Sequence, residues 1–119
     1  MSQAPVALPR VDVVIPCLNE VGVLRASVQT SLALFDANPR FDWRLVIADN
    51  GSTDGTGELA RDLEREDSRV RALIIPQRGR GLALREAWLG GNADVVSYMD
   101  VDLSTDIAHL PELIAMVAD

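Results

Sequence analysis

The chain has 119 residues, which is enough for one compact domain with a core and too few for two, so residues 1–119 are treated as one domain. A hydrophobic share of 48% excludes a disordered tail, and aromatic residues at 4% leave the core to aliphatic side chains. The formal net charge of -7 argues against nucleic acid as a partner, because the surface as a whole repels phosphate backbones.

Strand and helix patterns alternate along the chain. Short Val/Ile/Leu runs, typical of strands covered on both faces, are separated by stretches with apolar residues at helical spacing. We expect Pro16 to end the first strand, because proline has no N–H for the strand ladder. In chain order, beginning with a strand, the predicted strands and helices span residues 11–15, 20–35, 43–48, 59–67, 70–75, 82–89, 94–99 and 111–116.

This alternation predicts an α/β fold with a mostly parallel sheet and a Rossmann-like arrangement. Ligands bind such sheets at the carboxyl ends of the strands. Polar residues follow each predicted strand: residues 19–20, 49–54, 78–80 and 100–102. The sequence therefore predicts a binding site at this edge of the sheet.

Asp100 and Asp102 are the strongest candidate for a metal site. They lie two residues apart at the end of an otherwise apolar strand. Like charges at this spacing are costly when buried, and a divalent cation such as Mg²⁺, held by one or two carboxylates and phosphate oxygens, relieves that cost. An acidic chain that binds a diphosphate also needs such a cation.

The segment 49–56 follows the second predicted strand and is rich in turn residues. Asp49 directly follows the strand, where a carboxylate can accept hydrogen bonds from a base N–H or a ribose hydroxyl. Ser52 and Asp54 are candidates for the same ligand, and helix capping is their alternative role.

Positive charge gathers in one place, at Arg78 and Arg80 in the glycine-rich loop 77–81 and at Arg85 in the helix predicted after it. Such a loop can approach phosphate, since glycines admit backbone and arginines bind phosphate in a bidentate manner; a solvated surface turn is the alternative. The segment 16–20 is either a second ligand loop or a simple strand end. His109 more readily begins a helix than binds a ligand.

The dinucleotide and phosphate-loop glycine motifs are absent from the sequence. Cys17 is the single cysteine, so an internal disulfide is impossible, and we expect a small buried hydrophobic residue in a reducing compartment. No apolar run is long enough to span a membrane, so we expect a cytoplasmic protein.

The segments 14–20, 49–56, 79–83 and 100–104, taken in order, resemble the family 2 glycosyltransferases of the GT-A fold. The likeness runs from Val11 onward and is strongest to the subgroup of dolichyl- or polyprenyl-phosphate mannose and glucose synthases. It implies an inverting transfer of a hexose from GDP-mannose or UDP-glucose to an acceptor such as a lipid phosphate.

The resemblance also implies roles for individual residues. Pro16, Asn19 and Glu20 would border the nucleotide, Asp49 would hold the base or ribose, and Arg80 would lie near the donor. The aspartates of the segment 100–102 would bind Mg²⁺ or Mn²⁺ and the diphosphate. The metal would act as a Lewis acid on the leaving diphosphate.

Two positions depart from the pattern of close relatives. Ser104 stands where they often have a glutamine that binds the metal, and Arg80 stands where they often have lysine. The catalytic base lies further along in such enzymes, so it is not assignable. We expect the chain to be the N-terminal part of a longer enzyme. Association with the inner face of the membrane would then occur only through the C-terminal remainder of that enzyme. A truncated sheet edge also suggests a homodimer.

Three other classes of protein also place acidic residues at strand ends or bind nucleotide sugars. A nucleotidyltransferase-like domain would carry a glycine-rich loop after the first strand, where this chain has residues 16–20. A response-regulator-like domain needs a lysine at a strand end, and the sequence contains no lysine. A non-catalytic nucleotide-sugar-binding module remains indistinguishable from an enzyme by sequence.

Overall fold

The computed structural model describes residues 8–75, 93–101 and 111. Strands and helices alternate, which confirms the predicted α/β class. The predicted helix over 82–89 lies outside the described residues, as does that over 111–116 apart from Pro111. The elements are β1 (Arg10–Cys17), α1 (Val21–Asp36), β2 (Asp42–Asn50), α2 (Thr56–Glu66), β3 (Val70–Ile75) and β4 (Val95–Tyr98).

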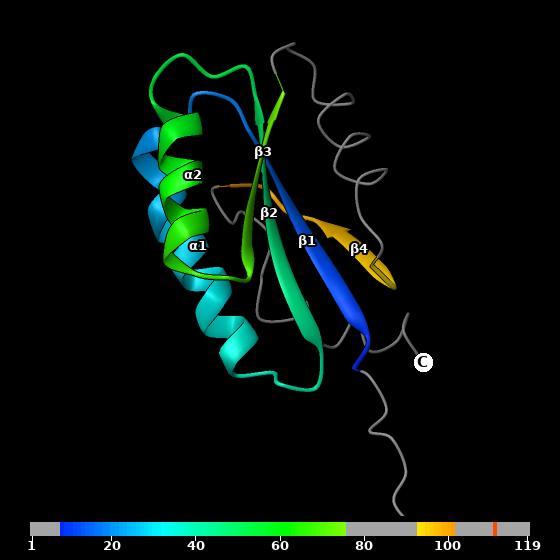
Figure 1. Cartoon of the computed structure of the whole chain (residues 1–119). Coiled ribbons are helices and arrows are strands. Elements are labelled where there is room, and N and C mark those ends of the chain that lie inside the picture. The colour runs from blue at the N-terminus through cyan, green and yellow to red at the C-terminus, as the bar shows by residue number, and fades with distance from the viewer. Residues whose placement is uncertain (1–7, 76–92, 102–110, 112–119) are drawn as a thin grey trace, which may run out of the picture.

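The four described strands pair in parallel in the order β3-β2-β1-β4 (Figure 1). From β1 the chain moves outward to β2 and β3, and it then returns to the opposite side of β1 for β4. The strand order thus reverses between β1 and β4. In open α/β sheets, the crevice at the carboxyl ends beside such a switch point is where ligands bind.

Both described helices cover the same face of the sheet (Figure 1). Alternate residues of β1 and β2 point into this layer, where full burial of each aliphatic side chain contributes about 1.5–3 kcal/mol. At the amino end of β2 the ring of Trp43 stacks on Phe35, with centroids 4.5 Å apart. Fully buried members of this core include Val11, Val13, Ile15, Leu24, Leu45 and Ile47.

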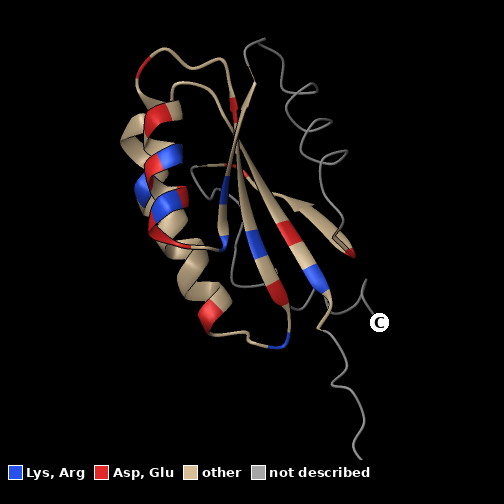
Figure 2. Cartoon of the chain, viewed as in Figure 1, with Lys and Arg blue, Asp and Glu red and all other residues tan. Residues whose placement is uncertain are grey.

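The opposite face of the sheet is divided. Toward the carboxyl ends it holds a small apolar cluster of Val14, Val46, Ala48 and Ile75. Toward the amino ends it carries charges of alternating sign (Figure 2), because Arg10 lies in register with Asp42, and Asp12 with Arg44.

Asp12 is the buried member of this charged set. Its side chain is 4% exposed, and its Oδ1 has no hydrogen-bond partner among the described residues. Burial raises the pKa of Asp12 above its usual range, and the charges of Arg10 and Arg71 partly oppose that rise. The carboxylate therefore weakens the fold in its ionised form.

The prediction that Pro16 ends the first strand is wrong. β1 continues to Cys17, and Pro16 lies in register with Ala48 of β2. The carbonyl of Val14 accepts a hydrogen bond from the Met99 N–H, so the backbone polar groups of Val14 point toward β4. The backbone of Pro16, two residues further on, points to the same side. Pairing with β4 ends at Val14, so no ladder bond is lost at Pro16.

Candidate functional site

The loops after β1 and β2 are tied together at the carboxyl edge of the sheet. The Asn19 N–H donates to Ser52 Oγ at 2.8 Å, and the Thr53 N–H donates to Asn19 Oδ1 at 2.8 Å. Asn19 has a φ of 53°, in the left-handed region that asparagine tolerates better than most residues. The two loops therefore form one hydrogen-bonded unit.

Asp54 accepts hydrogen bonds from the first turns of both helices. Its Oδ1 accepts from the Thr56 N–H at 3.0 Å and from the Thr56 hydroxyl, and its Oδ2 accepts from the Val21 N–H at 3.3 Å. The Thr56 hydroxyl, followed by these backbone donors, lowers the pKa of Asp54. The Glu20 N–H in turn donates to Thr56 Oγ1 at 2.9 Å.

The structure thus brings four predicted site residues together: Asn19, Glu20, Ser52 and Asp54. Gly55, and neither Ser52 nor Asp54, is the N-cap residue of α2. Asp54 accepts from the first backbone N–H of each helix from outside the cap position, and Ser52 joins the two loops. Contact of these residues with a nucleotide stays a prediction.

Asp49 is different, because nothing in the described structure pairs with its buried oxygen. Following Leu45 and Ile47 in alternation, it faces the helix-covered side of β2, where it is 2% exposed. Its Oδ1 has no hydrogen-bond partner within residues 8–75, 93–101 and 111. A buried carboxylate left unpaired is costly, and such a group is a candidate for binding a ligand's N–H.

Gly57 makes room for this carboxylate. A Cβ atom at Gly57 would lie 2.9 Å from Asp49 Oδ2, closer than real Cβ atoms come to other atoms. The first turn of α2 therefore approaches Asp49 only because residue 57 lacks a side chain. The positive end of the helix dipole offsets part of the cost of the buried charge there.

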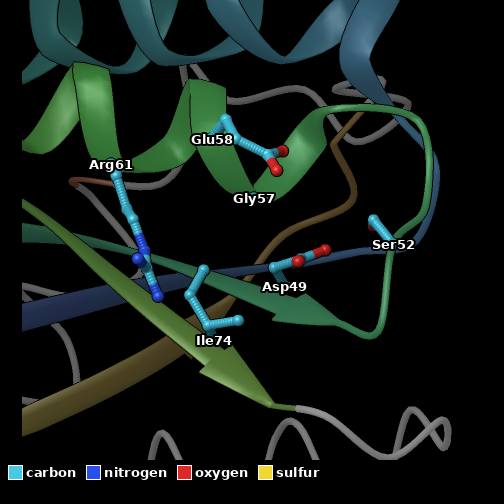
Figure 3. A pocket seen from close by; sticks show the side chains of 6 residues that line it. All are labelled: Asp49, Ser52, Gly57, Glu58, Arg61 and Ile74. Atoms are coloured by element: carbon cyan, nitrogen blue, oxygen red, sulfur yellow. The ribbon is translucent and has the colours of Figure 1, made fainter.

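A pocket of about 190 Å³ opens beside Asp49 (Figure 3). It lies between the ends of β2 and β3 and the first turns of α2. Ile74 supplies an apolar wall, while Glu58 and Arg61 project from α2 (Figure 3). The residues that line it are Asp49, Ser52, Gly57, Glu58, Arg61 and Ile74.

Sequence reasoning missed four of these lining residues: Gly57, Glu58, Arg61 and Ile74. A signal was present, since Glu58 and Arg61 are three residues apart and so share a face of α2. That face is recognisable as part of a site only once α2 is placed over the end of β3.

Asp100 lies at the other side of β1, two residues after the end of β4. Its neighbours Met99 and Val101 are buried in the helix-side core, and Ser27 Oγ of α1 donates to the Val101 carbonyl. Asp100 is therefore held between two anchored residues at the switch point. Asp102 and Arg80 lie outside the described residues.

Pro16 and Cys17 occupy opposite faces at the end of β1. Pro16 is half-buried on the face away from Asp49. Cys17 lies in register with Asp49 and is 2% exposed, and burial, followed by the charges of Asp49 and Glu20, raises the pKa of its thiol to about 12. The thiol thus stays protonated, as expected for a small buried residue.

Two features are absent from the described part of the chain. Among residues 8–75, 93–101 and 111, no three or more His, Cys, Asp or Glu side chains gather as they would around a metal ion. In the same residues no helix has the length and apolar character needed to cross a membrane.

The parallel sheet, its switch point and the pocket at the carboxyl edge define an open α/β domain with a candidate ligand site at that edge. The sequence matches the family "Glycosyl transferase family 2" over residues 12–119, and the chain belongs to this family.

Individual relatives agree with the family match. Glycosyltransferase AglD of Haloferax volcanii is 35% identical over 109 residues, covering 90% of this chain and 18% of the relative. Succinoglycan biosynthesis protein ExoA of Rhizobium meliloti is 42% identical over 93 residues, covering 74% and 26%. The chain thus spans about a fifth to a quarter of these relatives.

A solved structure shares the fold. It is a mannosyltransferase, PcManGT from Pyrobaculum calidifontis, in complex with GDP-Man and Mn²⁺. The TM-score is 0.74 at 23% identity, and the likeness covers 94% of this chain and 33% of the other. The predicted GT-A-like architecture is confirmed at the level of the fold.

Proposed function

We propose that the chain binds the nucleotide of a nucleoside-diphosphate sugar within a glycosyltransferase that transfers a hexose. The observation that carries this proposal is the buried Asp49 carboxylate, whose Oδ1 lacks a partner among the described residues and which lines the pocket at the carboxyl edge. Membership of glycosyl transferase family 2 gives that pocket its ligand class.

The strand order supports a direction for the bound nucleotide. The pocket lies at the ends of β2 and β3, the hydrogen-bonded loop unit follows β1 and β2, and Asp100 follows β4. A nucleotide with its base beside Asp49 would therefore extend past Asn19 and Glu20 toward Asp100. The family resemblance implies that Arg80 would lie near the donor phosphates, and Pro16 would border the nucleotide from the end of β1.

A divalent cation, Mg²⁺ or Mn²⁺, fits the chemistry at Asp100. Carboxylate oxygens are ligands that both ions accept, and Asp102 would supply the second carboxylate. The described residues alone do not complete a site, so phosphate oxygens of the donor would supply further ligands. When bound, such an ion acts as a Lewis acid on the leaving diphosphate. The neighbouring structure contains Mn²⁺ and GDP-Man, which supports this assignment.

The acceptor in this proposal is a lipid phosphate, and the transfer inverts the sugar configuration. Support comes from relatives named as enzymes of that class. One is dolichyl-phosphate beta-glucosyltransferase ALG5C of Trichomonas vaginalis, which is 26% identical over 105 residues. A cytoplasmic location at the inner membrane face belongs to the same proposal, and homodimer formation stays a prediction that sedimentation tests.

Calorimetry tests the proposal on the 119-residue chain. GDP and UDP are titrated with and without Mn²⁺ into the wild type, Asp102→Ala and the control Asp42→Ala, which alters an exposed residue at the amino end of β2. We expect nucleotide binding that Mn²⁺ strengthens and that Asp102→Ala, unlike the control, makes insensitive to Mn²⁺. If neither GDP nor UDP binds, the proposal is wrong.

A further inference from the structure

The charged residues of α2 fall into two groups. Four have partners: Asp62 pairs with Arg65, Glu66 with Arg25 at 3.1 Å, and the Ala72 N–H donates to Glu64 at 2.5 Å. Glu58 and Arg61 form no ion pair with any described residue. They are also the two charged residues of α2 that line the pocket.

The pocket therefore contains three charged groups without charged partners among the described residues. The carboxylates of Asp49 and Glu58 lie toward the Ser52 loop, whereas the Arg61 side chain extends from α2 toward β3 and Ile74 (Figure 3). Two hydrogen-bond acceptors thus lie on one side and a planar donor on the other. A volume of about 190 Å³ suits one planar group better than a whole nucleotide.

We propose that this pocket selects guanine, and that Glu58 and Arg61 determine the selection; the proposal rests on nucleotide binding at Asp49. The N1–H and N2–H₂ groups of guanine are adjacent donors, which the two carboxylates accept. The neighbouring O6 and N7 atoms are acceptors that a guanidinium binds in a bidentate manner. Ile74 provides an apolar surface for the flat ring.

Other bases match this arrangement less well. Uracil has a single ring N–H between two carbonyls, so a second carboxylate would face a carbonyl oxygen. Adenine presents an amino group where guanine has O6, which would set two donors against each other at Arg61. Asp49 is the buried charged group of the pocket, so a base that leaves its carboxylate without a partner carries the largest penalty. Glu58 and Arg61 are exposed and add a smaller preference through the hydrogen bonds that guanine completes with them.

Competitive calorimetry with GDP, UDP and ADP at fixed Mn²⁺ tests the inference. The variants are Arg61→Gln and Glu58→Gln, with Arg65→Gln and Glu66→Gln as controls on α2 away from the pocket. We expect the wild type to bind GDP about tenfold more tightly than UDP or ADP. Each pocket variant should reduce that preference several-fold, and the controls should retain it.

The outcomes separate the two proposals. If UDP or ADP binds as tightly as GDP, or if both pocket variants keep the wild-type preference, guanine selection by α2 is wrong while nucleotide binding stands. If no nucleotide binds, the proposed function itself fails. Thermal melting of each variant identifies misfolding, and because Glu58 and Arg61 are exposed we expect wild-type melting temperatures.

Discussion

The loop after β2 has two sides with opposite chemistry. On the side toward β1, a side-chain oxygen of each of Asn19, Ser52 and Asp54 accepts a backbone hydrogen bond. On the side toward β3, Asp49 Oδ1 is buried without a partner in the described structure. The difference teaches that paired polar groups shape this edge of the sheet, and that unpaired ones are available to a ligand. Substitutions on the two sides should therefore separate stability from binding.

The largest expected effect is on binding, from Asp49→Asn. The change removes the charge that accepts the base N–H, so we expect GDP affinity to fall about 10- to 100-fold by calorimetry. The melting temperature should stay the same or rise, because the variant no longer buries an unpaired carboxylate. A large fall in melting temperature would show that Asp49 stabilises the fold, as the paired groups on the side toward β1 do.

The second effect is on stability, from Thr56→Val. Thr56 is fully buried, and its hydroxyl accepts from the Glu20 N–H and donates to Asp54. Losing both hydrogen bonds should lower the free energy of unfolding by about 1–3 kcal/mol, measured by urea denaturation. The control Thr30→Val alters an exposed residue of α1 and should change it by less than about 0.5 kcal/mol. If Thr56→Val and Thr30→Val lower the free energy of unfolding equally, the Thr56 hydroxyl has no special role in stability.

A smaller effect comes from adding one methyl group at Gly57. Gly57→Ala places a Cβ against Asp49 Oδ2 and displaces the carboxylate, so GDP affinity should fall roughly threefold to tenfold. Gly22→Ala is the matched control, because a Cβ at that position in α1 meets nothing within 4 Å. The control should keep its affinity and gain about 0.5–1 kcal/mol of stability. Unchanged binding by Gly57→Ala would mean that the contact does not position Asp49.

The smallest effect concerns Asp12, remote from both sides of the loop. Its raised pKa means that the folded state holds the proton more tightly than the unfolded state, so stability falls as pH rises from the ordinary value of 3.8 through the folded pKa. Asp12→Asn should therefore raise the urea midpoint at neutral pH and raise it less in acid.

Most of the described fold could be predicted from the sequence. The apolar runs at 43–48 and 70–75 lie within β2 and β3, because their alternate residues pack into the core beneath the helices. The end of β1 could not be predicted, since whether the missing N–H of Pro16 matters depends on how far β4 extends. The early start of α2 was also missed, because Thr56 is held by Asp54 rather than by helix propensity.

The candidate site was predictable in part. Asp49 was identified because it directly follows the predicted strand 43–48. In the structure β2 extends to Asn50, so Asp49 lies within the strand near its carboxyl end. Glu58 and Arg61 were not identified, because their role depends on the packing of α2 over the end of β3. Hydrogen bonding of Asp54 to the start of α2 was foreseen as an alternative, but its reach to Val21 of the other helix depends on the tertiary fold.

A crystal structure of the chain with GDP and Mn²⁺ tests the central claim most directly. We predict the guanine ring in the pocket beside Ile74, with its N1–H donated to Asp49 and its diphosphate extending toward Asp100. The hydrogen bonds of Asn19, Ser52 and Asp54 should be unchanged from those described above. A base bound elsewhere, with Asp49 Oδ1 still unpartnered, would contradict the account.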